Sequence, residues 1–103
     1  MPEGSGDESI ERSFRRQAEL GRLLAAAEDY RVFASDSKHV GWLDHVRYKR
    51  HADHPDEIVV RSRGLLGTRR RALPFEAVED VRPSERTVVL RITHTAIERA
   101  PAA

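Results

Sequence analysis

The sequence predicts a mainly β fold: a small antiparallel β-barrel of about six short strands, preceded by an N-terminal α-helix. Three observations support this prediction. Short apolar runs rich in strand-forming residues lie between about residues 30 and 92, clusters of turn-forming residues separate them, and the segment before them has helical periodicity instead. Closure into a barrel is expected because an open sheet of this size would leave unpaired edges.

The 103 residues are enough for one domain and not for two. Residues 1–8 are polar and acidic and are expected to be a disordered N-terminal tail. Residues 9–29 are expected to form the N-terminal helix, residues 30–92 the β-domain, and residues 93–103 a C-terminal tail with a frayed end.

The predicted helix has one apolar face. Ile10, Phe14 and Ala18 are spaced four residues apart, and Leu20 and Leu24 continue the series with some drift. Such a face indicates docking, either on the barrel or on a second copy of the chain. Phe14, Leu20 and Leu24 are therefore candidate partner-binding residues.

The strands are expected where apolar runs meet turn signals, at residues 30–33, 39–49, 57–63, 69–73, 80–82 and 87–92. In the second run the apolar parity breaks near Leu43 and Asp44, beside Gly41. A break of this kind predicts a β-bulge or a sharp bend.

Several segments in order resemble the PRC-barrel family: Val40-Gly41-Trp42-Leu43-Asp44-His45-Val46, Ile58-Val59-Val60, Gly64-Leu65-Leu66-Gly67 and Leu73-Pro74-Phe75-Glu76-Ala77-Val78. That family includes the cytoplasmic domain of the photosynthetic reaction-centre H subunit and the C-terminal domain of bacterial ribosome-maturation factors. The resemblance covers about residues 30–92. One departure is that His45 stands where the family usually has Asp, with Asp44 one place earlier.

The resemblance implies a PRC-type β-barrel that serves as an assembly or docking platform, and it supplies no catalytic residue. Fold-level similarity does not identify a partner.

Composition excludes several function classes. With 18 basic and 17 acidic residues the net charge is +1, so the whole protein has no general attraction to nucleic acid or anionic lipid. The absence of cysteine excludes disulfides, thiol nucleophiles and cysteine zinc sites. There is no signal-peptide segment and no apolar run of roughly 20 residues that would span a bilayer. The expected location is the cytoplasm.

No catalytic, cofactor or metal site emerges. His51 and His54 have a spacing that brings two ligands together only on a helix, and Pro55 indicates a solvated polar loop there. No serine stands in a nucleophile-elbow motif, and the Gly64–Gly67 loop lacks the lysine of a phosphate-binding loop. We therefore expect a protein that is not an enzyme.

The strongest functional signal is basic: Arg61, Arg63, Arg69, Arg70 and Arg71. Such a patch suits RNA phosphates, anionic headgroups or an acidic protein surface, although a solvated outer face of the barrel is the favoured interpretation. Leu65 and Leu66 lie between two glycines and are either folded over the end of the barrel, which is favoured, or offered to a partner.

The function predicted from the sequence is a non-catalytic protein-interaction or assembly module that self-associates as a homodimer or docks on a larger assembly. The alternative is an RNA- or ribosome-associated factor that binds through an Arg-rich barrel face. The sequence does not identify the partner.

Overall fold

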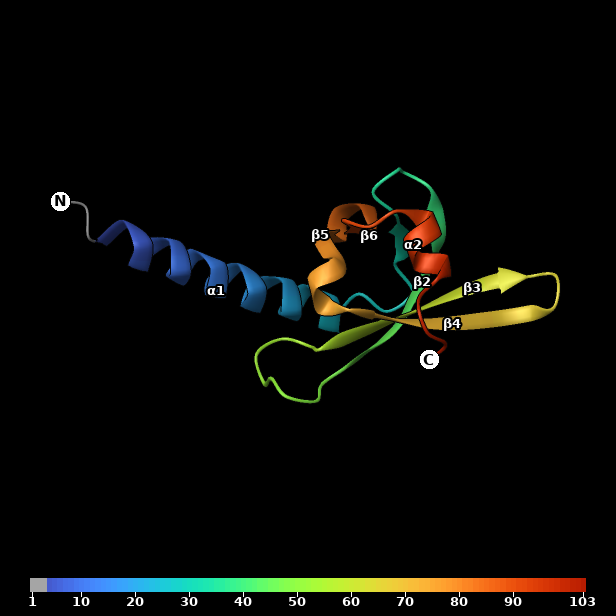
Figure 1. Ribbon diagram of the computed structural model, residues 1–103, viewed down its shortest axis with the longest axis horizontal. Coiled ribbons are helices and arrows are strands. Elements are labelled where there is room, and N and C mark those ends of the chain that lie inside the picture. Colours follow the sequence, from blue (N-terminus) through green and yellow to red (C-terminus); the bar gives the residue numbers. More distant parts are fainter. Residues whose placement is uncertain (1–3) are drawn as a thin grey trace.

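The computed structural model describes residues 4–103, with side chains from residue 10 onward, and has the dimensions of an elongated body of 59 × 28 × 27 Å (Figure 1). A long helix, α1 (Gly4–Ala25), precedes six strands: β1 (Arg31–Phe33), β2 (His39–Arg47), β3 (Glu57–Gly64), β4 (Gly67–Pro74), β5 (Val78–Arg82) and β6 (Thr87–Leu90). Two short 3₁₀ turns, η1 (Phe75–Ala77) and η2 (Pro83–Glu85), flank β5, and a short helix, α2 (His94–Glu98), follows β6.

All six strands belong to one sheet in the order β4-β3-β2-β1-β6-β5. The mainly β fold with an N-terminal helix is therefore confirmed. Two details differ from the sequence prediction. β1 and β6 pair in parallel, whereas every other pair is antiparallel. Among the described residues the ladder does not close, because Pro74 ends β4 and the chain passes through η1 into β5 without a hairpin.

The C-terminal residues lie along the outer edge of β4. The Ala72 N–H donates to the Pro101 carbonyl oxygen, and the Ala103 N–H donates to the Arg70 carbonyl oxygen, both at 3.1 Å. The frayed end predicted for this segment is therefore wrong. An edge strand offers unpaired backbone groups, and an extended segment of the same chain can satisfy them.

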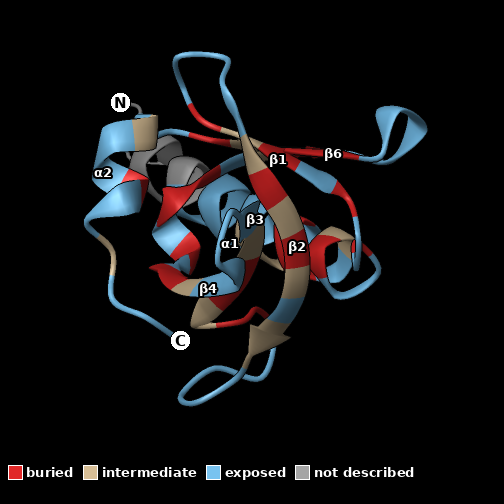
Figure 2. Ribbon diagram, turned by 90° about the vertical axis from the view of Figure 1, so that its right-hand side faces the viewer, coloured by how far each residue is buried: buried red, intermediate tan, exposed pale blue. Residues whose placement is uncertain are grey.

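The core lies between the curled sheet and the second half of α1 (Figure 2). Leu20 and Leu24 of the helix are buried with Val32, Leu43 and Leu90 of the sheet. Burying each leucine contributes about 1.5–3 kcal/mol. The sequence predicted that this helix face docks either on the barrel or on a second copy of the chain. Leu20 and Leu24 dock on the barrel of their own chain and are not exposed to a partner.

Helix α1 begins and ends earlier than predicted. It starts at Gly4, so residues 4–8, which were expected to be disordered, are helical, and the rest of that predicted tail lies outside the described residues. It ends at Ala25 rather than at residue 29. Asp29 has a φ of 71°, a left-handed conformation that Asp tolerates better than most residues and that turns the chain into β1.

The first half of α1 extends away from the body (Figure 1). Ile10 and Phe14 remain 54% and 62% exposed there, so the apolar series read from the sequence divides in two. Its C-terminal part belongs to the core, and its N-terminal part lies in solvent.

The predicted bulge in β2 is confirmed. The register between β2 and β3 shifts between Leu43 and His45, which leaves Asp44 as the extra residue. Gly41 lies just before it with a φ of 154°, and a Cβ there would lie 2.2 Å from the Arg61 carbonyl oxygen. Only glycine allows β2 and β3 to approach this closely.

Replacing Gly41 tests this close approach. We expect Gly41→Ala to lower the free energy of unfolding by about 2 kcal/mol or more, because both the backbone conformation and the space are unsuitable for a Cβ. Gly64→Ala is the matched control, since the nearest atom to a Cβ there is 3.7 Å away. Urea denaturation measures both variants, and equal stability of the two would contradict this account of the β2–β3 contact.

Candidate binding surface

Strands β3 and β4 form a hairpin that protrudes from the body on the side opposite α1 (Figure 1). The two strands pair without interruption from Glu57 and Pro74 to Gly64 and Gly67, which leaves Leu65 and Leu66 as the tip. Both leucines are fully exposed, at 106% and 92%. The favoured prediction that they fold over the barrel end is therefore wrong, because the hairpin carries them beyond the core.

The register of the hairpin divides the predicted arginine patch. Arg61 lies opposite Arg70, and Ser62 lies opposite Arg69. Residues opposite each other share a face and consecutive residues alternate, so Arg61, Arg63 and Arg70 belong to one face and Arg69 and Arg71 to the other. The sequence predicted that these arginines share one face of the barrel, whereas they lie on both faces of the hairpin.

Acidic residues neutralise much of the first face. The Arg61 guanidinium pairs with Asp29 and, at 3.4 Å, with Asp44, and Arg70 Nε lies 3.4 Å from the same Asp44 carboxylate. The hydrogen bond with Asp29 raises the pKa of Arg61. The hydrogen bond with His45, and then the Arg70 charge, hold the pKa of Asp44 below its ordinary value. A face neutralised in this way attracts phosphate weakly.

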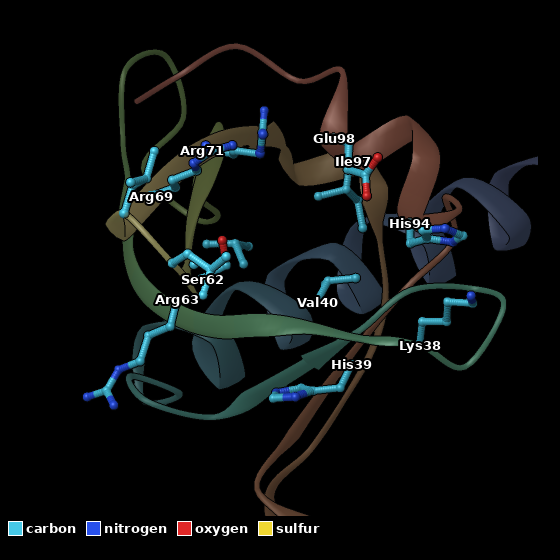
Figure 3. A pocket seen from close by; sticks show the side chains of 14 residues that line it. Lys38, His39, Val40, Ser62, Arg63, Arg69, Arg71, His94, Ile97 and Glu98 are labelled. Carbon is cyan, nitrogen blue, oxygen red and sulfur yellow. The ribbon is translucent and has the colours of Figure 1, made fainter.

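The second face forms one wall of an open cleft of about 790 Å³ (Figure 3). Arg69 and Arg71 stand on the β4 side of this cleft, and Ile97 and Glu98 stand across it on α2. Apolar residues of the strands, among them Val40, contribute to its lining. The cleft therefore combines apolar area with a basic rim, the composition of a surface that contacts an acidic and partly apolar partner.

Not all the arginines of the hairpin are equally available. The Arg71 guanidinium donates to the Ala100 carbonyl oxygen at 3.0 Å, which ties it to the C-terminal segment. Within the described part of the chain, Arg63 and Arg69 form no ion pair, and both side chains are exposed. Their charges are the ones most available to an anionic partner.

The loop between β2 and β3 is more ordered than the solvated loop predicted from its composition. The His54 ring, only 7% exposed, stacks on His51 at 4.2 Å and on Phe75 at 4.5 Å between ring centroids. Hydrogen bonds from the backbone N–H groups of Arg50 and Lys49 lower the pKa of Asp56. The Phe75 contact could not be predicted from local patterns, since that residue lies on a different segment.

The described residues contain no group of three or more His, Asp or Glu side chains that would hold a metal ion. Within the same part of the chain, no helix combines the length and apolar character needed to cross a bilayer. The functional features found are thus the exposed tip, the cleft and the edge of β4.

No protein-family model matches the sequence, and neither does any curated protein. Among solved structures the chain is similar to RimM of Pseudomonas aeruginosa, a 16S ribosomal RNA processing protein, with a TM-score of 0.51 and 22% identity. The chain shares a fold with RimM. The match covers 69% of this chain and 42% of RimM, so the chain spans less than half the length of that protein. At this identity RimM supports the PRC-barrel resemblance at the level of the fold.

The lowered pKa of Asp44, caused first by the hydrogen bond with His45 and then by the Arg70 charge, predicts how stability depends on pH. Because the pKa of Asp44 is lower in the folded state, its contribution is complete above the unfolded value of about 3.9 and is lost as the pH falls below it. We expect Asp44→Asn to lower the urea midpoint at pH 7. Between pH 7 and pH 3, the urea midpoint of this variant should fall less than that of the wild type. Asp53→Asn, in an exposed loop, is the control. An unchanged pH profile in Asp44→Asn would contradict the assignment.

Proposed function

We propose that this chain is a non-catalytic, cytoplasmic binding module that docks on a larger protein assembly through the β3–β4 hairpin. The observation that carries the proposal is the pair of fully exposed leucines at the hairpin tip. Large apolar side chains held together in solvent are typical of protein–protein contact sites. The basic cleft beside the tip extends this surface and favours a partner with acidic residues.

The geometry of the hairpin favours binding. Eight paired positions from Glu57 and Pro74 to the tip hold the strands together, so the hairpin loses little conformational freedom when it binds. Burying each leucine in a partner would contribute about 1.5–3 kcal/mol. Leu65 and Leu66 can therefore anchor a contact without any rearrangement of the core.

Self-association is part of the same proposal and involves a different element. Leu20 and Leu24 are used within the core, which leaves Ile10 and Phe14 as the exposed large apolar side chains among residues 10–25 of α1. They are four residues apart and lie on one face of the projecting half of the helix. We assign homodimer formation to this part of α1, separate from the hairpin that docks on other proteins.

Substitution at the tip tests docking. We expect the double variant Leu65→Ser and Leu66→Ser to capture at least tenfold less of its main protein partner from a native lysate, as measured by quantitative mass spectrometry. Its melting temperature should be unchanged because neither side chain is buried. Tyr48→Ser, at a half-exposed residue away from the tip, is the control. Equal capture by the double variant and the wild type would refute the proposal.

A second candidate function is RNA binding. Two observations favour it: the available charges of Arg63 and Arg69 on the hairpin, and the shared fold with RimM, which is described as a 16S ribosomal RNA processing protein. Against it, Asp29 and Asp44 neutralise Arg61 and Arg70, and no aromatic residues lie between the arginines to stack on bases.

Salt dependence separates the two candidates. For the docking proposal we expect no retention of a 16S ribosomal RNA fragment on a filter at about 150 mM salt. Retention that weakens steeply with salt, and is lost when Arg69, Arg70 and Arg71 are all replaced by alanine, would favour the RNA-associated factor instead. The leucine double variant is the control in this assay, because its charge is unchanged.

A further inference from the structure

The outer edge of β4 has the geometry of a strand-addition site. β4 is an edge strand, and its pairing with β3 fixes which backbone groups point outward. The Ala72 N–H bonds to Pro101 and therefore points away from β3. In an antiparallel ladder, alternate residues point their N–H and C=O groups in the same direction. Thr68 and Arg70 consequently direct their backbone groups outward as well.

Among residues 4–103, the segment that follows α2 bonds to only part of this edge. It bonds to the Ala72 N–H and the Arg70 carbonyl oxygen, and Ala102 lies opposite Arg71. Toward the hairpin tip, the outward N–H of Arg70 and both backbone groups of Thr68 continue the same row. A groove of about 320 Å³ follows this part of the edge and is lined by Thr68, Arg69, Arg70, Arg71, Ala102 and Ala103.

The charges beside the edge of β4 determine which kind of strand it would accept. Arg69 lies on the cleft face of β4 and forms no ion pair among the described residues, whereas Arg70, on the opposite face, already pairs with Asp44. The side chains of an added strand also alternate between the two faces. A strand whose acidic residues face the cleft would therefore meet the charge of Arg69, whereas a basic strand would be repelled by it.

We propose that the edge of β4 from Thr68 to Arg70 accepts an extended, acidic segment of a protein partner as an additional antiparallel strand. The inference rests on the docking function proposed above and specifies the chemistry of the partner. The backbone of this edge alternates donors and acceptors, which a peptide matches. A nucleic acid backbone offers phosphate acceptors and would leave the Thr68 carbonyl unpaired. A second copy of β4 would bring its own arginines against these arginines.

The probe is a fluorescein-labelled peptide of alternating Glu and Val, long enough to form a short strand. Two controls share its length: a peptide with Lys in place of Glu, and the acidic peptide with alternate backbone amides N-methylated so that it cannot pair with a strand. We expect saturable binding of the acidic peptide in a fluorescence anisotropy titration of the full chain. Both controls should bind at least tenfold more weakly.

Variants of the edge test the backbone contacts. Thr68→Pro removes an N–H that points away from β3, so the hairpin pairing is retained while one edge donor is lost. We expect at least tenfold weaker binding of the acidic peptide, whereas Thr68→Val, which keeps the N–H, should bind normally. Melting temperatures confirm that both variants fold. In the wild type, saturating peptide should slow hydrogen exchange at the Thr68 and Arg70 amides.

The charge contribution has its own pair of variants. Arg69→Glu is expected to weaken peptide binding at least fivefold. Arg50→Glu makes the same change in charge in the β2–β3 loop, at the end of β3 away from the hairpin tip, and should have no effect.

Three results would overturn the inference. The N-methylated peptide could bind as tightly as its parent, or the Thr68→Pro variant could bind the acidic peptide as tightly as the wild type does. The third result is that the wild type forms an oligomer that Thr68→Pro converts to monomer. The last would assign the edge to a second copy of the chain. Partner capture by Thr68→Pro separates this inference from the docking proposal. Capture that persists in Thr68→Pro but is lost in the leucine double variant would leave docking intact and refute strand addition alone.

Discussion

The pairing of β3 with β4 is the constraint on which the binding surface depends. Because Gly64 and Gly67 pair directly, only Leu65 and Leu66 remain to form the tip, and every position back to Glu57 and Pro74 is fixed by that turn. A shift of one residue would exchange Arg69 with Arg70 between the faces of the hairpin. The same register directs the backbone of Thr68 and Arg70 outward, so the exposed tip, the basic cleft and the open edge of β4 all follow from it.

The bulge in β2 gives the two faces of the hairpin different electrostatic character. Gly41 lets β2 approach the β3 backbone closely, and the bulge places Asp44 beside Arg61 and Arg70. Arg61 and Arg70 on that face serve mainly to hold the sheet together. Arg69, on the other face, forms no ion pair within the described part of the chain, so its charge faces the cleft and is open to a partner. One structural irregularity thus separates stabilising arginines from those suited to recognition.

Several features could be predicted because their causes are local. The parity break around Leu43 and Asp44 beside Gly41 identified the bulge, and the spacing of Leu20 and Leu24 identified an apolar face of α1, although it left open whether that face docks on the barrel or on a second copy of the chain. Three predictions that concern β4 were wrong because nonlocal contacts decided them. Leu65 and Leu66 were placed over the core, the C-terminal segment was expected to fray, and the ladder was expected to close. Each depends on how far β4 extends and on what lies along its edge.

The sequence by itself determined the mainly β fold, the N-terminal helix, the bulge and the residues of the basic cluster, because periodicity, glycine positions and residue type act over a few neighbouring residues. Only the tertiary structure decided that Arg61 and Arg70 are paired with acidic residues, that Phe14 is exposed while Leu24 is buried, and that residues 101–103 lie along β4. Those outcomes depend on strand register and on contacts between segments far apart in the chain, which no local pattern encodes.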